Sequence, residues 1–201
     1  MQSNLSIQLS KVIIGSVGLY FLYLFVSALL IVDRRHIGTE DGTYINSTTD
    51  APYIHKLAFD LTQECNSNLC RVQNILDYVT NIPYKINNFN ANSPQETIQQ
   101  NFGDCDDKSN LLISLLHELN LESYFVLVPH HIFVIVHLDD INLNNYVKGL
   151  YLNGKKYYIL ESTAKGSNIG FPLHYRISEI DAIIEPFDNH KLDINKLEWK
   201  L

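Results

Sequence analysis

The chain has 201 residues, of which 46% are hydrophobic and 18% are charged. This length fits one folded domain with an appendage, and this composition excludes disordered, collagen-like and linker-dominated proteins. The net charge of -7 argues against a nucleic-acid partner, because phosphate backbones are bound through clustered lysine and arginine. The 3 cysteines are too few for a disulfide-stapled scaffold, and no paired CxxC motifs are present to hold structural zinc.

Residues 12–32 form an uncharged apolar segment near the amino terminus. As a helix this segment would span ~30 Å, which is the thickness of the hydrocarbon core of a bilayer. A cleaved signal peptide is one alternative, but its apolar region is usually ~7–15 residues long and ends in an A-x-A-like site, which does not follow Ala28. A buried core helix is the other, although such a long uncharged run is unusual in a soluble domain of this size. We therefore interpret residues 1–32 as a tail and a transmembrane anchor.

The orientation of this anchor is poorly determined by its flanking charges. Lys11 precedes the apolar segment and Arg34 and Arg35 follow it, so the positive-inside count is nearly balanced. We expect a single-pass membrane protein whose soluble part is exocytoplasmic. The acidic body has little electrostatic reason to lie on anionic lipid. Residues 33–51 are typical of a linker, and residues 52–201 are expected to form the folded domain.

The first half of this domain has helical patterns. Apolar residues recur at helical spacing over residues 54–61 and 69–79, which predicts two helices. A loop-like stretch follows at residues 87–94, and the Ser-Pro-Gln-Glu sequence at 93–96 can begin a short helix. A wide apolar stripe then predicts a central buried helix that begins at Cys105 and ends near residue 120.

The second half of the domain has strand patterns. Four segments are rich in tyrosine, valine, isoleucine and phenylalanine, at residues 124–128, 131–138, 146–152 and 155–160. The last two flank Asn153-Gly154, a strong two-residue hairpin signal. Helices followed by strands predict an α+β fold in which an antiparallel sheet packs on the helix that begins at Cys105.

Three residues form a pattern typical of thiol catalysis. Cys105 lies in the first turn of the central helix, where unpaired backbone N–H groups and the helix dipole stabilise a thiolate. A base is provided by His131, which shares one strand face with Phe133 and Ile135. Glu161 ends the strand predicted at residues 155–160. Nucleophile, base and orienting carboxylate are the three groups of a catalytic triad.

These residues lie in three segments that resemble a known family, the transglutaminase-like branch of the papain-fold cysteine enzymes. The segments are SPQETIQQNFGDCDDKSNLLISLLHELN, HIFVIVHL and YYILESTAKG. The resemblance covers about residues 69–170 and implies that Cys105 is the nucleophile, His131 the base and Glu161 the group that orients His131. The animal enzymes carry aspartate where this chain has Glu161, whereas bacterial relatives with Glu-x-Thr are similar to it. This difference concerns the substrate class more than the fold.

Neighbouring residues have simpler interpretations. His130 is expected to point to the opposite strand face from His131, and a register shift of one residue would exchange the two. Asp104, Asp106 and Asp107 are expected to cap and charge the first helical turn, and Asp107 could instead form a salt bridge. As anions they would oppose thiolate formation unless they are turned away.

Two further uses of cysteine and histidine were considered. His131 and His137 would lie roughly 20 Å apart on one strand face, too far to share a zinc ion. Cys65 and Cys70 are compatible either with a small disulfide in an oxidising compartment or with two buried thiols in a reducing one. The sequence does not decide between these states.

The pattern and the resemblance together predict a membrane-anchored cysteine enzyme that acts on amide bonds of a protein or peptide through a thioester. Water as the acceptor would make it a peptidase or amidase, and an amine would make it an acyltransferase. Hydrolysis is favoured because no second substrate site is recognisable. No metal or organic cofactor is expected. The alternative is a catalytically inactive domain of the same fold that tethers a partner at the membrane.

Overall fold

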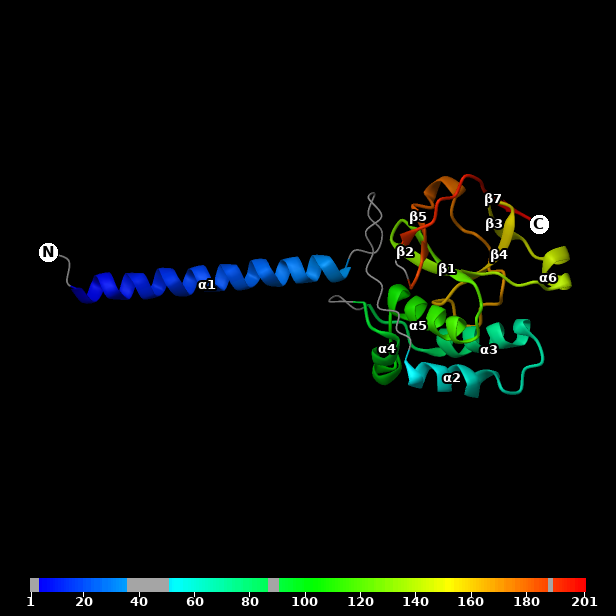
Figure 1. Cartoon of the computed structure of the whole chain (residues 1–201), viewed down its shortest axis with the longest axis horizontal. Coiled ribbons are helices and arrows are strands. Elements are labelled where there is room, and N and C mark those ends of the chain that lie inside the picture. Colours follow the sequence, from blue (N-terminus) through cyan, green and yellow to red (C-terminus); the bar gives the residue numbers. More distant parts are fainter. Residues whose placement is uncertain (1–3, 36–50, 87–90, 188–189) are drawn as a thin grey trace.

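The computed structural model describes residues 4–35, 51–86, 91–187 and 190–201 (Figure 1). Helix α1 (Asn4–Arg35) contains one segment, Gln8–Ala28, that is long and apolar enough to cross a membrane. None of this segment is buried by the rest of the described chain. The alternative of a buried core helix is therefore wrong. Most of the expected linker, residues 36–50, lies outside the described residues.

Helices α2 (Pro52–Thr62) and α3 (Asn68–Asn81) confirm the two helices predicted from apolar spacing. Ser67 caps α3, because its hydroxyl accepts a hydrogen bond from the backbone N–H of Cys70 at 3.2 Å. The helix ends before Pro83, since proline restricts the preceding residue to extended backbone. The buried stripes on both helices face the same core, made by Ile54, Ala58, Val72, Ile75, Leu76 and Val79.

Cys65 and Cys70, whose state the sequence left open, are joined by a disulfide across the turn between α2 and α3. Their Cα atoms are 5.5 Å apart. Asn74 donates a side-chain hydrogen bond to the sulfur of Cys65 at 3.3 Å. Cys105 is therefore the free cysteine of this chain.

Two more helices lead to the centre of the domain. The short helix α4 (Pro94–Gln100) begins with a capping box, in which Ser93 and Glu96 satisfy each other's backbone N–H groups. Helix α5 (Cys105–Glu118) is the central helix, and its side chains from Asp107 to Leu116 are all buried. It ends slightly earlier than expected, and Asn120 then adopts a left-handed φ of 55°.

One curled antiparallel sheet packs on these helices (Figure 1). Its spatial order is β6-β5-β1-β2-β4-β3-β7, so β1, β2 and β4 form the middle. The strands are β1 (Ser123–Val128), β2 (His131–Val136), β3 (Gly149–Leu152), β4 (Lys155–Leu160), β5 (Ala182–Glu185), β6 (His190–Lys191) and β7 (Leu197–Lys200). The α+β fold with an antiparallel sheet on the α5 helix is thus confirmed.

The two faces of the sheet bury different cores. One face packs on the helical layer through residues such as Leu127, Ile132 and Val134. The other face packs beneath the carboxyl-terminal segment through residues such as Phe133, Ile135 and Ile159. Alternation along β2 therefore holds as predicted, and His131 and Phe133 lie on the same side of the strand.

The structure differs from the predictions in three places. The strand expected at residues 146–152 begins only at Gly149, because helix α6 (Ile141–Tyr146) precedes it, capped by the Asp140 carboxylate. Strands β5 to β7 and the short 3₁₀ helix Ile177–Glu179 were not predicted. His130 was placed wrongly on the strand: it is an exposed residue of the β1–β2 turn with a φ of 61°.

The predicted hairpin at Asn153-Gly154 is confirmed. Both residues have positive φ, 50° and 93°, as a type I′ turn requires. The turn joins β3 to β4 in register, with Leu152 opposite Lys155. This register also fixes where β4 ends and therefore where Glu161 lies.

Deleting residues 1–32 is expected to give a soluble, folded domain, because α1 buries none of its apolar segment against the rest of the described chain. Size-exclusion chromatography should show a monodisperse species, and its far-ultraviolet circular dichroism should retain the mixed helix and strand signal. The full chain in a non-ionic detergent is the control. Aggregation of the truncated chain with loss of that signal would show that α1 contributes to folding.

Candidate active site

Cys105 is the first residue of α5 and is partly exposed to solvent. Two residues earlier, the space around Gly103 requires a glycine, because a Cβ atom there would lie 2.7 Å from the Cβ of Asp107. The backbone of Gly103 is also paired with the α3–α4 segment, since its N–H donates to the carbonyl of Pro83 at 3.2 Å. The Gly-x-Cys pattern thus reflects a close approach that fixes the start of the helix.

His131 and Glu161 meet at neighbouring strand ends. Strands β2 and β4 pair with Val134 opposite Leu160, which brings Glu161 beside the beginning of β2. The Nε2 atom of His131 lies 2.8 Å from Oε2 of Glu161. Both side chains are largely buried, with exposed fractions of 18% and 11%. This is the pairing expected from the sequence.

The thiol of Cys105 lies close to the imidazole of His131, since both side chains line one cavity and the thiol contributes to raising the pKa of His131. Because Nε2 is engaged by Glu161, Nδ1 is the ring atom left for Cys105. The structure therefore brings together all three residues singled out in the sequence, in the order thiol, imidazole, carboxylate.

The charges of this array favour a protonated imidazole. Burial alone would lower the pKa of His131, but the hydrogen bonds with Cys105 and Glu161 and the negative charge of Glu161 outweigh it and raise the pKa to about 9. Burial would likewise raise the pKa of Glu161, but hydrogen bonds from His131 and Thr163 lower it. Near neutral pH the pair is an imidazolium and a carboxylate.

Thr163 fixes the second oxygen of Glu161. Its backbone N–H and its hydroxyl both donate to Oε1, at 3.0 and 2.6 Å. The carboxylate is thus held on one oxygen by Thr163 and on the other by His131. The Glu-x-Thr pattern is visible in the sequence, but the role of Thr163 becomes apparent only from these two contacts.

Tyr175 covers the imidazole from the carboxyl-terminal segment. Its ring is stacked near that of His131, with centroids 6.4 Å apart and an interplanar angle of 21°. Burial, and then the charges of Glu161 and Cys105, raise the pKa of Tyr175. Tyr175 was not predicted from the sequence, because it lies in an irregular segment without periodicity.

The three aspartates near the thiol behave differently from one another. Asp107 is fully buried, and its carboxylate accepts hydrogen bonds from the backbone N–H groups of Asn92 and Asp104 and from the Asn92 amide. Asp106 is partly buried; burial, then the hydrogen bond and charge of Asp104 and the charge of Asp107, raise its pKa to about 8. A neutral Asp106 does not oppose a thiolate at Cys105.

This acidic group has the spacing of a metal site, since carboxylate oxygens of Asp104, Asp106 and Asp107 lie within 4.8 Å of one another. However, both oxygens of Asp107 already accept hydrogen bonds from protein N–H groups. The residues around the thiol are thus arranged for hydrogen bonding with one another.

His137 lies beyond the opposite end of β2 from His131, and its Nδ1 is 2.8 Å from the carbonyl oxygen of Lys156.

Lys108 is a buried cation one helical turn after Cys105. Its side chain is 1% exposed and donates to the carbonyl oxygens of Ile82 at 2.9 Å and Thr80 at 3.4 Å. These carbonyls lie at the carboxyl end of α3, where the helix dipole favours a cation. Burial nevertheless lowers the pKa of Lys108 to about 8. The residue ties the first turns of α5 to the end of α3.

This buried lysine predicts a specific pH dependence of stability. Its folded pKa of about 8 lies below the ordinary value of 10.5, so the unfolded chain binds the proton more tightly between these two values. Stability contributed at this position should rise with pH over that window. The difference in free energy of unfolding between wild type and Lys108→Met should therefore increase by at most about 1.4 kcal/mol per pH unit. Urea unfolding from pH 7.5 to 10.5 measures it, and a constant difference would contradict it.

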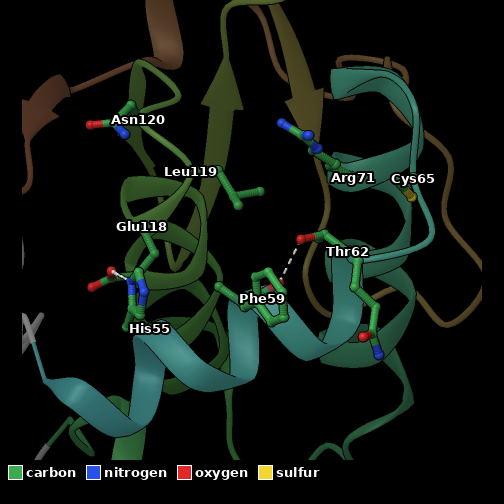
Figure 2. A pocket seen from close by; sticks show the side chains of 10 residues that line it. His55, Phe59, Thr62, Cys65, Arg71, Glu118, Leu119 and Asn120 are labelled. Atoms are coloured by element: carbon green, nitrogen blue, oxygen red, sulfur yellow. Dashed lines mark hydrogen bonds and ion pairs between the residues drawn. The ribbon is translucent and has the colours of Figure 1, made fainter.

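Two cavities lie at opposite ends of α5. One, of about 290 Å³, opens beside Cys105 and His131. The other, of about 350 Å³, lies at the carboxyl end of α5 (Figure 2). In Figure 2 His55 is paired with Glu118 at 2.8 Å, and the exposed ring of Phe59 lies between them and the disulfide turn. The second cavity is ~20 Å from the thiol along the helix axis, too far for it to hold the reacting group of a substrate.

Comparison with known families places this arrangement. Residues 55–131 match the family model of the transglutaminase-like superfamily. This part of the domain is transglutaminase-like in sequence. The matched segment runs from α2 through Cys105 to His131, so it includes the thiol and the imidazole, and Glu161 lies beyond it.

A solved structure of low sequence identity is also similar to this chain. A structure described as "a Putative Cysteine Protease from Cytophaga hutchinsonii" aligns with a TM-score of 0.48 and 16% sequence identity. The alignment covers 74% of this chain and 48% of that protein, so this chain spans about half of its length. No curated protein matches the sequence significantly.

Proposed function

We propose that this protein is a membrane-anchored cysteine enzyme that hydrolyses amide bonds of a peptide or protein through a thioester. The observation that carries the proposal is the array in which Cys105 and His131 line one cavity, while Nε2 of His131 is 2.8 Å from Oε2 of Glu161. A structural cysteine would not need a charged imidazole held in place by a buried carboxylate. The match of residues 55–131 to the transglutaminase-like superfamily supports the same chemistry.

The reaction follows from the positions of these groups. The Cys105 thiolate attacks the carbonyl carbon, and the oxyanion accepts a hydrogen bond from the Cys105 backbone N–H, which has no partner within the helix. The C–N bond breaks as the His131 imidazolium gives its proton to the leaving amine. His131 then accepts a proton from water, which attacks the thioester carbon. The C–S bond breaks, the carboxylic acid leaves and the thiol is regenerated.

The anchor and the compartment belong to the same proposal. Gln8–Ala28 has the length and composition of a single membrane span. The disulfide between Cys65 and Cys70 supports an oxidising compartment, because cytosolic thiols are kept reduced in most organisms. The disulfide therefore supports placing the domain on the exocytoplasmic side of the membrane.

Thiol reactivity tests the enzyme against an inert domain of the same fold. We expect iodoacetamide to label Cys105 rapidly at pH 6, because a thiolate is reactive and a thiol is not. Mass spectrometry of the full chain in a non-ionic detergent locates the label, and Cys105→Ala is the blank. His131→Ala should slow labelling to the rate of an ordinary thiol. Slow labelling of the wild type would instead favour the interaction domain.

A further inference from the structure

The cavity beside Cys105 has an unusual combination of linings. It lies between the first turn of α5 and the β1–β2 turn, and has a volume of about 290 Å³. Its apolar part is made by Leu127, Val128, Pro129 and Ile132. Its polar part is made by the reacting pair, His130 and two carboxyl groups, those of Asp106 and Asp181. No lysine or arginine of the described chain lines it.

Asp181 supplies an uncompensated negative charge at this cavity. Its backbone N–H donates to the carbonyl of Leu127 at 2.9 Å, which fixes the residue at the point where β5 joins β1. The residue is exposed, and among the described residues no ion pair includes its carboxylate. The charge is therefore available to a group that enters the cavity from solvent.

Asp106 can provide a second negative charge when a cation binds nearby. Its carboxyl group lies next in the chain to the thiol and is partly buried, and its pKa is raised to about 8. A cation bound nearby would stabilise the ionised form of Asp106 and lower this pKa again. An anionic group would be repelled by the carboxylate of Asp181.

We propose that this cavity binds a cationic side chain, of the lysine or arginine type, adjacent to the acyl group that Cys105 attacks. Such side chains combine an aliphatic stem with a charged head, which matches an apolar wall that ends at a carboxylate. The recognised group is part of the acyl substrate and is distinct from the leaving amine. The inference rests on the proposed role of Cys105 as the nucleophile and adds a substrate class to it.

Two thiol reagents of similar size and opposite charge test this preference without a known substrate. Trimethylammonioethyl methanethiosulfonate is cationic and sulfonatoethyl methanethiosulfonate is anionic. In both cases the thiolate attacks the divalent sulfur of the reagent, a mixed disulfide forms and methanesulfinate leaves. The measured quantity is the ratio of the two rate constants at Cys105, relative to the same ratio for free 2-mercaptoethanol. The full chain is used in a non-ionic detergent, and Cys105→Ala is the blank.

The wild-type ratio of the cationic to the anionic rate constant should exceed the reference ratio by about tenfold. The reason is that the negative charge at the cavity attracts the cationic reagent and repels the anionic reagent. Asp181→Asn should reduce the ratio about fivefold, and Asp181→Lys should bring it below the reference. The matched control is Asp60→Asn, which removes an exposed carboxylate on α2 and should leave the ratio unchanged. Because an unfolded chain would react with about the reference ratio, the circular dichroism of each variant is compared with that of the wild type.

A wild-type ratio equal to the reference, or one that Asp181→Asn leaves unchanged, would overturn the proposal. Absence of reaction with both reagents would also overturn it, because the cavity would then be closed to a group of side-chain size. Failure of the proposed function has a different signature. In that case iodoacetamide labels Cys105 slowly at pH 6, whereas the ratio of the charged reagents remains measurable.

Discussion

Cys105→Ala is expected to abolish amide hydrolysis, with a loss of at least about 10⁴-fold in kcat, because the covalent step has no other nucleophile in this array. Comparing the peptides released from a membrane protein extract by the wild type and by the variant would identify cleaved bonds. The fold should survive, since Cys105 is partly exposed and alanine is a strong helix former. Circular dichroism and the melting temperature check this.

The matched control removes the other two cysteines together. The double variant Cys65→Ser/Cys70→Ser loses the disulfide and about 2 kcal/mol of stability, as expected for so short a loop, but it retains Cys105 and the groups that contact it. Its turnover below its melting temperature should stay within a few-fold of wild type. Turnover that persists in Cys105→Ala, or that vanishes only in the double variant, would disprove the assignment of the nucleophile.

Glu161→Gln is expected to lower kcat by roughly 10²–10⁴-fold. The amide keeps the shape of the carboxylate but loses the charge that raises the pKa of His131 to about 9. The basic limb of the pH–rate profile, which marks loss of the imidazolium proton, should therefore lie near pH 9 in the wild type and move to lower pH in the variant. Initial rates from pH 5 to 10.5 measure both effects.

The same pKa shift gives the sign of the stability effect. Because His131 binds its proton more tightly in the folded chain than at its ordinary pKa of 6.5, its pairing stabilises the fold fully below pH 6.5 and progressively less as the pH rises through 9. Glu161→Asp should give intermediate rates, since the charge survives with a shorter reach. A Glu161→Gln variant with the wild-type rate and an unshifted basic limb would exclude Glu161 as the orienting group.

The sequence predicted those parts of the fold whose local signals agree with the tertiary structure. The helices α2, α3 and α5 carry apolar stripes that face the core, and Asn153-Gly154 adopts the positive φ values that its turn requires. The three residues of the candidate site were found because each lies at the end of a regular element: Cys105 at a helix start, His131 at a strand start and Glu161 after a strand end.

The parts that were missed depend on contacts distant in sequence. Strands β6 and β7 are short edge strands that exist through pairing with β5 and β3, which local periodicity does not reveal. Helix α6 is only 6 residues long, buries only Leu143 and depends on the Asp140 cap. His130 was placed wrongly because alternation says nothing about a two-residue turn, in which its left-handed φ removes it from either face. Asp181 and Tyr175 reach the site only through tertiary packing.

The nucleophile and its base belong to different layers of the molecule: Cys105 comes from the helices, and His131 and Glu161 come from the sheet. Buried polar contacts join these layers close to the site, since the hydroxyl of Ser109 on α5 lies 3.1 Å from that of Ser162 and bonds to the carbonyl of Ile132. The distance between sulfur and imidazole is thus a measure of interlayer alignment. A sideways shift of one layer by a fraction of a side chain would separate the thiol from the imidazole while leaving each layer intact. Substitutions in the core between the layers should therefore change the catalytic rate more than the melting temperature.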